Sequence, residues 1–267
     1  MIYDAGPSDS HAGHIYRSMQ NGFFHLSEKP PSMDREQHIR EKKYSSDGKA
    51  VWMVDFIERE SPVVKKALEV VKGSEIDSIE VFRESSIGIE KSIDRAARLG
   101  VKGGDILDKM IHEVYVLDIL EEAGEKPVLE LEDANTRYFH PREKGSEYFT
   151  DIYSNKKDSI DEETATAMTQ ATFKSGDVNV NLNSSWMGLS REALIEAQKI
   201  EKKTGHRFFN REFSEMSSRA YVDEEARFFV IRGEKDLAGD MLSKKLYDLE
   251  TGEEIETEEY IHDQLHR

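Results

Sequence analysis

Two histidines, His11 and His14, lie three residues apart near the start of the sequence, with Gly13 between them. Imidazole nitrogens are common ligands of transition metals, and such a pair can bind a metal when a third ligand comes from elsewhere. Asp4, Asp9 or a more distant carboxylate is a candidate for that ligand. Gly13 disfavours the His-Glu-x-x-His helix of zinc proteases, so two solvated loop histidines are the ordinary alternative.

Asp55 interrupts an apolar run over residues 50–57, and this run predicts a buried strand. In open α/β sheets, functional sites gather at the C-terminal ends of strands. A carboxylate there could hold a divalent cation together with Glu58 or Glu60. An edge position or a basic partner is the alternative, because an unpaired buried carboxylate is costly. The candidate metal ligands are therefore His11, His14 and Asp55.

Glu130 and Glu132 lie two residues apart in a predicted strand over residues 127–132, so both point to one face. Paired carboxylates hold cations in some nucleases and phosphatases, although the wet face of a half-exposed strand has the same pattern. The sequence contains no Walker loop, no glycine-rich dinucleotide fingerprint and no Gly-x-Ser-x-Gly elbow. No residue is therefore assigned as catalytic.

Composition excludes several classes of protein. The 267 residues include 54 Asp and Glu against 37 Lys and Arg, a net charge of −17 that argues against binding nucleic acid or anionic lipid. The absence of Cys excludes disulfide scaffolds, Cys-ligated zinc, iron–sulfur clusters and a thiol nucleophile. No run approaches the roughly 18 apolar residues of a membrane span, and no secretory signal is visible. We expect a cytoplasmic or virion-associated protein without a cofactor.

Residues 1–48 show no sustained period of 2 or 3.6 and predict an extended N-terminal arm. Phe23, Phe24 and Leu26 form an apolar patch in this segment that could dock onto the body or onto a neighbouring molecule. A loop of this length is unusual inside a compact domain and is usually functional. The patch is therefore the predicted interaction site.

Residues 49–267 predict a mixed α/β body, with a division into two lobes near residues 135–158 as an open option. A βαβ-like unit (about 50–83) is followed by a helical pair (about 87–123). Further elements are a short helix over 159–172, a strand over 178–183, a helix over 190–204, a strand over 227–232 and a C-terminal hairpin over 246–257. The predicted fold class is α+β with a mixed sheet.

The long arm and the lack of a catalytic signature favour a non-enzymatic structural or interaction protein. We expect a subunit of a larger assembly, such as a virion shell or connector component, that docks through its N-terminal arm. Its partners would be copies of itself or other assembly subunits, with no membrane and no direct nucleic-acid binding. A metal-dependent hydrolase using Asp, Glu and His ligands is one alternative, with a divalent cation as cofactor. An acidic inhibitor that mimics nucleic acid is another, because residues 248–263 contain eight acidic side chains and no Lys or Arg.

Overall fold

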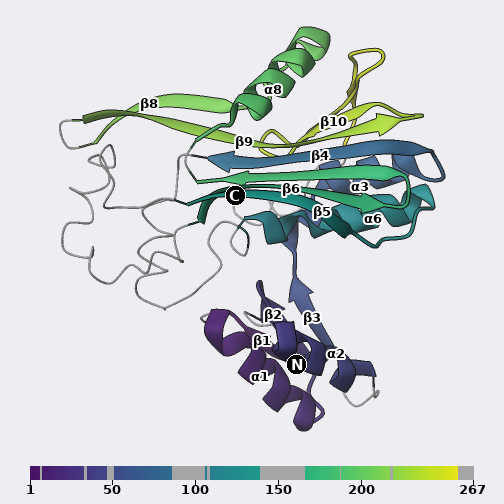
Figure 1. Ribbon diagram of the computed structural model, residues 1–267, viewed down its shortest axis with the longest axis vertical. Coiled ribbons are helices and arrows are strands. Elements are labelled where there is room, and N and C mark those ends of the chain that lie inside the picture. The colour runs from purple at the N-terminus through teal and green to yellow at the C-terminus, as the bar shows by residue number, and fades with distance from the viewer. Residues whose placement is uncertain are drawn as a thin grey trace. The chain divides into compact units, whose positions relative to one another are not determined.

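The computed structural model describes residues 1–6, 8–32, 35–46, 51–85, 106, 109–138, 166–186, 188–216 and 219–257 (Figure 1). The chain divides into two compact units. Unit 1 comprises Met1–Phe56, Glu90–Ile111 and Tyr138–Thr166, and unit 2 comprises Ile57–Ile89, His112–Arg137 and Ala167–Arg267.

Unit 1 contains a parallel three-stranded sheet in the order β1-β2-β3. Helix α1 (Ser8–Gln20) connects β1 (Ile2–Asp4) to β2 (His25–Glu28), and α2 (Arg35–Ser46) connects β2 to β3 (Trp52–Asp55). The parallel register pairs the last residue of β1 with Ser27, and the last residues of β2 and β3 with each other. The three strands therefore end at one edge of the sheet.

The prediction of an extended arm over residues 1–48 is wrong, because β1, α1, β2 and α2 lie in this segment. The buried hydrophobic residues of helix α1 are Ala12, Ile15 and Met19, a narrow stripe among polar residues that gives little periodic signal. Strands of three or four residues are also too short to show alternation. In the predicted interaction patch, Phe23 is half exposed and Leu26 lies in β2.

Unit 2 is built on a nine-stranded sheet in the order β12-β11-β10-β9-β4-β7-β6-β5, with β8 paired to β9. Strand β4 pairs in parallel with β7 and antiparallel with β9, so the sheet is mixed. The strands are β4 (Ile76–Ser85), β5 (Glu130–Tyr138), β6 (Thr166–Ser175), β7 (Val178–Ser185), β8 (Asn210–Met216), β9 (Arg219–Gly233), β10 (Leu237–Asp240), β11 (Lys245–Asp248) and β12 (Glu254–Ile255).

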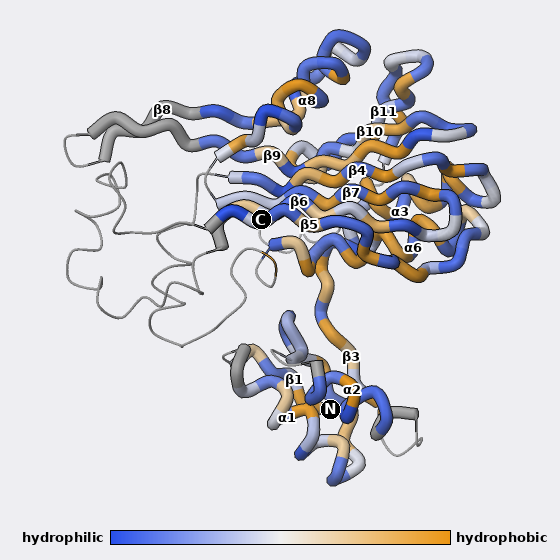
Figure 2. Tube along the Cα trace, in the orientation of Figure 1, coloured by the Kyte–Doolittle hydropathy of each residue, from blue (hydrophilic) through white to orange (hydrophobic). Residues whose placement is uncertain are grey.

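Helices cover both faces of the central strands. On one face, α8 (Arg191–Thr204) packs on β4 and β9 through a core that includes Phe82, Phe228, Val230, Ala193, Ala197 and Ile200. On the other face, Phe229 contacts Tyr115 at the start of α6 (Tyr115–Ala123), with ring centroids 5.8 Å apart. Helix α3 (Pro62–Val71) packs beside it, close to β10 and β11. Figure 2 shows hydrophobic residues along these strands and helices, as expected for a sheet buried on both faces.

Several predicted elements are confirmed. The strand–helix–strand order over residues 50–83 is present as β3, α3 and β4, although β3 and β4 belong to different sheets. Helix α8 begins after its predicted cap Ser190, and β11 and β12 form the predicted C-terminal hairpin. Of the helical pair, α6 ends at Ala123 as expected, while the first predicted helix lies outside the described residues.

The helix predicted over residues 159–172 is wrong from residue 166 onward, where β6 runs instead. Ala171 and Met168 gave the segment a helical spacing, but antiparallel pairing with β7 decides its conformation. The first residues of this prediction lie outside the described part of the chain. Among the described residues, every helix is too short or too polar to cross a lipid bilayer.

Helix α2 buries a carboxyl group that has no hydrogen-bond partner. Glu41 is 3% exposed, and neither of its carboxylate oxygens accepts a hydrogen bond within the described structure. His38 Nδ1 lies 3.7 Å from Oε2, but burial lowers the pKa of His38 and so disfavours a compensating positive charge. Burial raises the pKa of Glu41 from 4.5 to about 7.

This raised pKa predicts a pH dependence of stability. The folded state holds the Glu41 proton more tightly than the unfolded state, so stability falls as the pH rises from 4.5 to about 7. Glu41→Gln should therefore raise the free energy of unfolding at pH 8, by about 1–3 kcal/mol, and change it little at pH 4. Urea unfolding at both pH values measures this. The matched control is Glu36→Gln on the exposed side of α2, and an equal pH dependence in both variants would contradict the assignment.

Candidate functional site

The carboxyl edge of the unit 1 sheet carries several ionisable side chains. Lys29 directly follows β2 and is joined to Pro30 by a cis peptide bond. Glu28, the last residue of β2, accepts a hydrogen bond of 2.8 Å from the hydroxyl of Tyr3. Asp55 ends the neighbouring strand β3. Ligands of parallel α/β sheets bind at this edge, so Lys29 is the cationic candidate in unit 1.

Asp4, the last residue of β1, lies among histidines beside this edge. Its carboxylate accepts a hydrogen bond of 2.9 Å from the Gly6 N–H, and it lies 2.8 Å from His14 Nδ1 and 3.7 Å from His25 Nε2. Burial acts to raise the pKa of Asp4, but the Gly6 N–H and His14 outweigh burial and lower it. Asp4 therefore stays ionised at the first turn of α1.

The predicted metal ligands are in three different settings. Both ring nitrogens of His11 lie 2.8 Å from backbone carbonyl oxygens, whereas His14 contacts Asp4, one of the third ligands considered from the sequence. Asp55 ends β3, and the carboxylate pair on β5 is exposed. Within the described residues, no three His, Cys, Asp or Glu side chains gather so that they could hold a metal ion. The metal site stays a prediction.

Unit 2 contains a buried network of charged side chains around Arg83 on β4. Arg83 Nη1 donates to Glu58 Oε1 at 2.8 Å and to Glu113 Oε1 at 3.3 Å. The other oxygen of Glu58 lies 2.7 Å from His112 Nδ1. Glu58 lies in η1 (Ile57–Glu60), and the other two partners lie in η2 (Met110–Val114). The exposed fractions of the side chains are 10% for Arg83, 4% for Glu58, 5% for Glu113 and 12% for His112.

The network fixes the charge states of its members. Burial opposes ionisation of Glu58, but His112 and Arg83 reverse the effect and lower its pKa to about 2. Burial raises the pKa of Glu113, although Arg83 opposes this shift. Because a carboxylate only accepts hydrogen bonds, the His112 Nδ1 must donate to Glu58. This contact selects the His112 tautomer with the proton on Nδ1, an arrangement suited to proton transfer.

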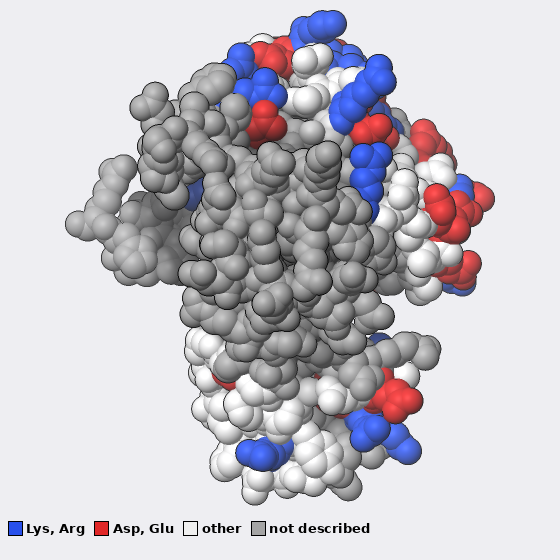
Figure 3. Space-filling model, turned by 60° about the vertical axis from the view of Figure 1, so that its left-hand side comes forward, with Lys and Arg blue, Asp and Glu red and all other residues white. Residues whose placement is uncertain are grey.

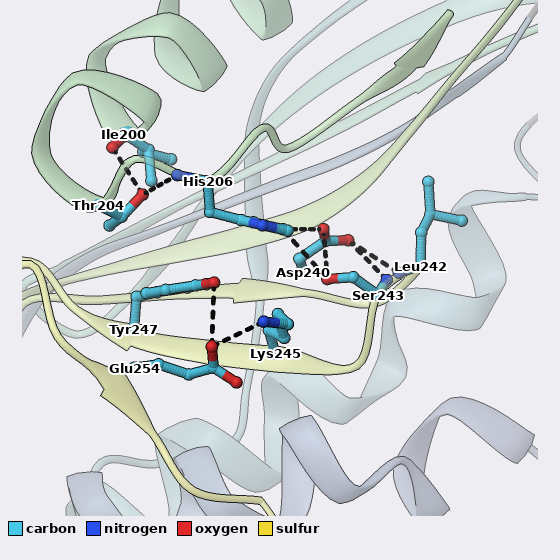
Figure 4. Close-up of polar contacts among 9 residues, drawn as sticks. All are labelled: Ile200, Thr204, His206, Asp240, Leu242, Ser243, Lys245, Tyr247 and Glu254. Carbon is cyan, nitrogen blue, oxygen red and sulfur yellow. Dashed lines mark hydrogen bonds and ion pairs between the residues drawn. The ribbon is translucent and has the colours of Figure 1, made fainter. Parts of the chain in front are cut away.

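A second imidazole–carboxylate pair lies between the end of α8 and the β10–β11 turn (Figure 4). His206 Nε2 lies 2.8 Å from Asp240 Oδ2, and Ser243 Oγ lies 2.7 Å from the same oxygen and 3.2 Å from the same nitrogen. In a serine hydrolase, Ser and Asp contact opposite ring nitrogens. Here they share one, and Asp240 Oδ1 also accepts the N–H groups of Leu242 and Ser243. This cluster therefore joins two segments and is no nucleophilic triad.

Comparison with solved structures shows which known proteins have a similar fold. No protein-family model and no curated protein matches the chain. Solved structures do match: UDP-N-acetylglucosamine 3-dehydrogenase GnnA from Acidithiobacillus ferrooxidans has a TM-score of 0.59 at 16% identity, over 97% of this chain and 64% of that chain. Levoglucosan dehydrogenase in complex with NADH and levoglucosan has a TM-score of 0.61 at 13% identity, over 92% and 56%. An NAD binding oxidoreductase from Klebsiella pneumoniae has a TM-score of 0.60 at 14% identity, over 92% and 56%.

The chain shares the fold of these oxidoreductases. It spans less than two thirds of the length of each of the three. The prediction of a non-enzymatic structural protein, with its virion and assembly roles, is wrong, because the matched structures are of dehydrogenases and other oxidoreductases. The hydrolase and nucleic-acid-mimic alternatives are overturned with it. On the face shown in Figure 3, acidic and basic side chains of the described residues are interspersed. The expectation of no cofactor is also wrong, since the matched structures include NADH complexes.

The residues present fit only part of an NAD site. The parallel βαβαβ arrangement of unit 1 corresponds to one half of a doubly wound dinucleotide-binding sheet. No two of the 17 glycines in the sequence are separated by a single residue, so the glycine-rich turn that holds a pyrophosphate is missing. The ionised carboxylate of Asp4 at the first turn of α1 would repel a phosphate. These residues alone therefore do not fit a whole dinucleotide.

Sequence reasoning missed the three residues that now matter most. No pattern in the sequence indicates Lys29, because the strand before it has only four residues. Arg83 ends the alternating segment over residues 77–83 that predicts a strand, and a charge directly after Val81 and Phe82 is a usable signal. His112 lies among the apolar residues of a predicted helix, and an ionisable side chain in such a place is a similar signal.

The network around Arg83 predicts that the stability of the fold decreases at low pH. Because the Glu58 pKa is lowered, its contribution to stability is present above pH 4.5 and is lost as the pH falls toward about 2. A shift of that size corresponds to about 3 kcal/mol, so Glu58→Gln should lower the free energy of unfolding by about this amount at pH 7. The loss should nearly vanish at pH 2.

Urea unfolding at the two pH values measures the effect. Glu60→Gln is the matched control, because Glu60 lies in the same 3-10 helix but is 66% exposed and pairs with Lys65. We expect the control to change stability by less than about 0.5 kcal/mol. An equal loss for Glu58→Gln at both pH values would contradict the charge assignment.

Proposed function

We propose that the chain is the substrate-binding and proton-transferring part of an NAD-linked oxidoreductase that acts on a hydroxyl group of a carbohydrate. The fold it shares with dehydrogenases supports this, and the names of two of those structures state sugar substrates, UDP-N-acetylglucosamine and levoglucosan. The phosphates of the dinucleotide would need a glycine-rich turn that this sequence does not contain.

The observation on which the proposal rests is the His112–Glu58–Arg83 arrangement. Oxidation of an alcohol to a carbonyl removes a hydride and the hydroxyl proton. A nicotinamide, if held by the chain, would supply the hydride acceptor. The proton needs a base, and an imidazole whose Nδ1 is held by an ionised carboxylate is a suitable one. Glu58 also stabilises the imidazolium that forms, while Arg83 keeps Glu58 ionised.

Lys29 provides a second proposed role, on the unit 1 sheet. An ammonium group at the carboxyl edge of a parallel sheet can donate hydrogen bonds to a hydroxyl or carbonyl oxygen. Such a donor would bind an oxygen of a ligand held at the edge of the unit 1 sheet. We therefore assign Lys29 as a ligand-binding group of unit 1.

An assay of NADH formation from NAD⁺ tests the proposal, with levoglucosan and UDP-N-acetylglucosamine as substrates. Because the phosphate-binding turn is missing, we expect turnover only at NAD⁺ concentrations of about 1 mM or higher. His112→Asn should lower kcat by about 10²–10⁴-fold, since it removes the base.

His206→Asn is the matched control, because His206 also pairs with a carboxylate in unit 2 but lies in the α8–β10 cluster. We expect its kcat to stay within about twofold of the unmodified chain. The proposal is overturned if neither sugar yields NADH, or if the two variants lose activity equally.

A further inference from the structure

His11 is a buried side chain with two backbone partners on different loops. It lies in the first turns of α1 and is 1% exposed. Its Nδ1 lies 2.8 Å from the carbonyl oxygen of Pro30, and its Nε2 lies 2.8 Å from that of Gly6. Each ring nitrogen therefore faces an acceptor. One contact is a hydrogen bond in the neutral ring, and both are hydrogen bonds in the doubly protonated ring.

The two partners belong to the loops that leave the carboxyl edge of the sheet. Gly6 lies between β1 and α1, and Pro30 follows Lys29 at the end of β2. Gly6 is itself fixed, because its N–H donates to Asp4 Oδ1 at 2.9 Å and a Cβ at this position would lie 2.9 Å from the same oxygen. The loop that carries Lys29 is thus linked through His11 to Gly6, whose N–H donates to Asp4.

We propose that His11 is a positioning residue that holds the Lys29–Pro30 segment at the carboxyl edge of the sheet through the Pro30 carbonyl. The inference rests on the proposed function in one respect, the assignment of Lys29 as a ligand-binding group of unit 1. It concerns a residue first considered as a metal ligand. The contact with the Pro30 carbonyl holds the segment that carries Lys29, and the contact with the Gly6 carbonyl holds the imidazole ring of His11 in place.

Two amide replacements separate these contacts. The side-chain nitrogen of Asn occupies the place of Nδ1, so His11→Asn keeps a donor toward Pro30. The side-chain nitrogen of Gln occupies the place of Nε2, so His11→Gln keeps a donor toward Gly6. Each variant keeps one donor and loses the other, so a purely structural role predicts that the effect of each variant follows its loss of stability. His14→Gln, three residues along the same helix, is the control, because His14 contacts Asp4 instead of the Lys29 loop.

The first measurement is made by NMR on the full chain, from the carbonyl ¹³C resonance of Pro30 and the side-chain resonances of Lys29. We expect His11→Gln to shift both, while His11→Asn and His14→Gln leave them near their original positions. Equal shifts in the two His11 variants, or no shift in His11→Gln, would overturn the proposal. This readout needs no turnover, so it remains informative if the proposed function fails.

The second measurement is the NADH-formation assay on the same variants. His11→Gln should lower kcat about tenfold, the equivalent of one lost hydrogen bond, and His11→Asn less than about twofold. Thermal unfolding midpoints of the two variants should agree. If kcat falls equally in both variants, in step with stability, His11 is only structural and the proposal is wrong.

Discussion

A guanidinium buried within a sheet must be paired with carboxylates, and this requirement organises unit 2. Arg83 meets it through Glu58 and Glu113, which come from two separate 3-10 helices. The next residue, Glu84, points to the opposite face of β4 and accepts hydrogen bonds from the backbone N–H and the hydroxyl of Ser190. Ser190 in turn caps α8 by accepting from the Ala193 N–H. Two consecutive charged residues thus set the positions of the structural layers on both faces of the central strand.

The same requirement gives the chain its best candidate for chemistry. Once Arg83 keeps Glu58 ionised, Glu58 can only accept a hydrogen bond from His112, and the tautomer of the imidazole follows. Removing one partner of the ion pair would leave an uncompensated buried charge beside the proposed base. Unit 1 contributes a different element, a parallel sheet whose carboxyl edge ends in Lys29. The fold that the chain shares with dehydrogenases supports the proposal that it oxidises an alcohol.

Local patterns predicted part of this fold. The Ser190 cap and its amphipathic stripe predicted α8, strict alternation predicted β7, and turn residues predicted the C-terminal hairpin. Short-range signals failed where pairing with a distant strand decides the conformation of a segment, as in β6. They also failed where elements are short and polar, as in β1 and α1. The site was less predictable still. Glu58 was noticed only as a neighbour of Asp55, because its partner Arg83 lies 25 residues away and nothing local indicates that contact.

The most direct test of the central claim is a double-mutant cycle between Arg83 and Glu58, measured by urea unfolding at pH 7. Arg83→Met and Glu58→Gln are compared singly and together. If the two side chains form the buried pair that organises unit 2, the double variant should be more stable than the sum of the single losses predicts, by about 2–3 kcal/mol. Additive losses, with a coupling below about 0.5 kcal/mol, would show that the two residues act independently and that the network around His112 does not exist as described.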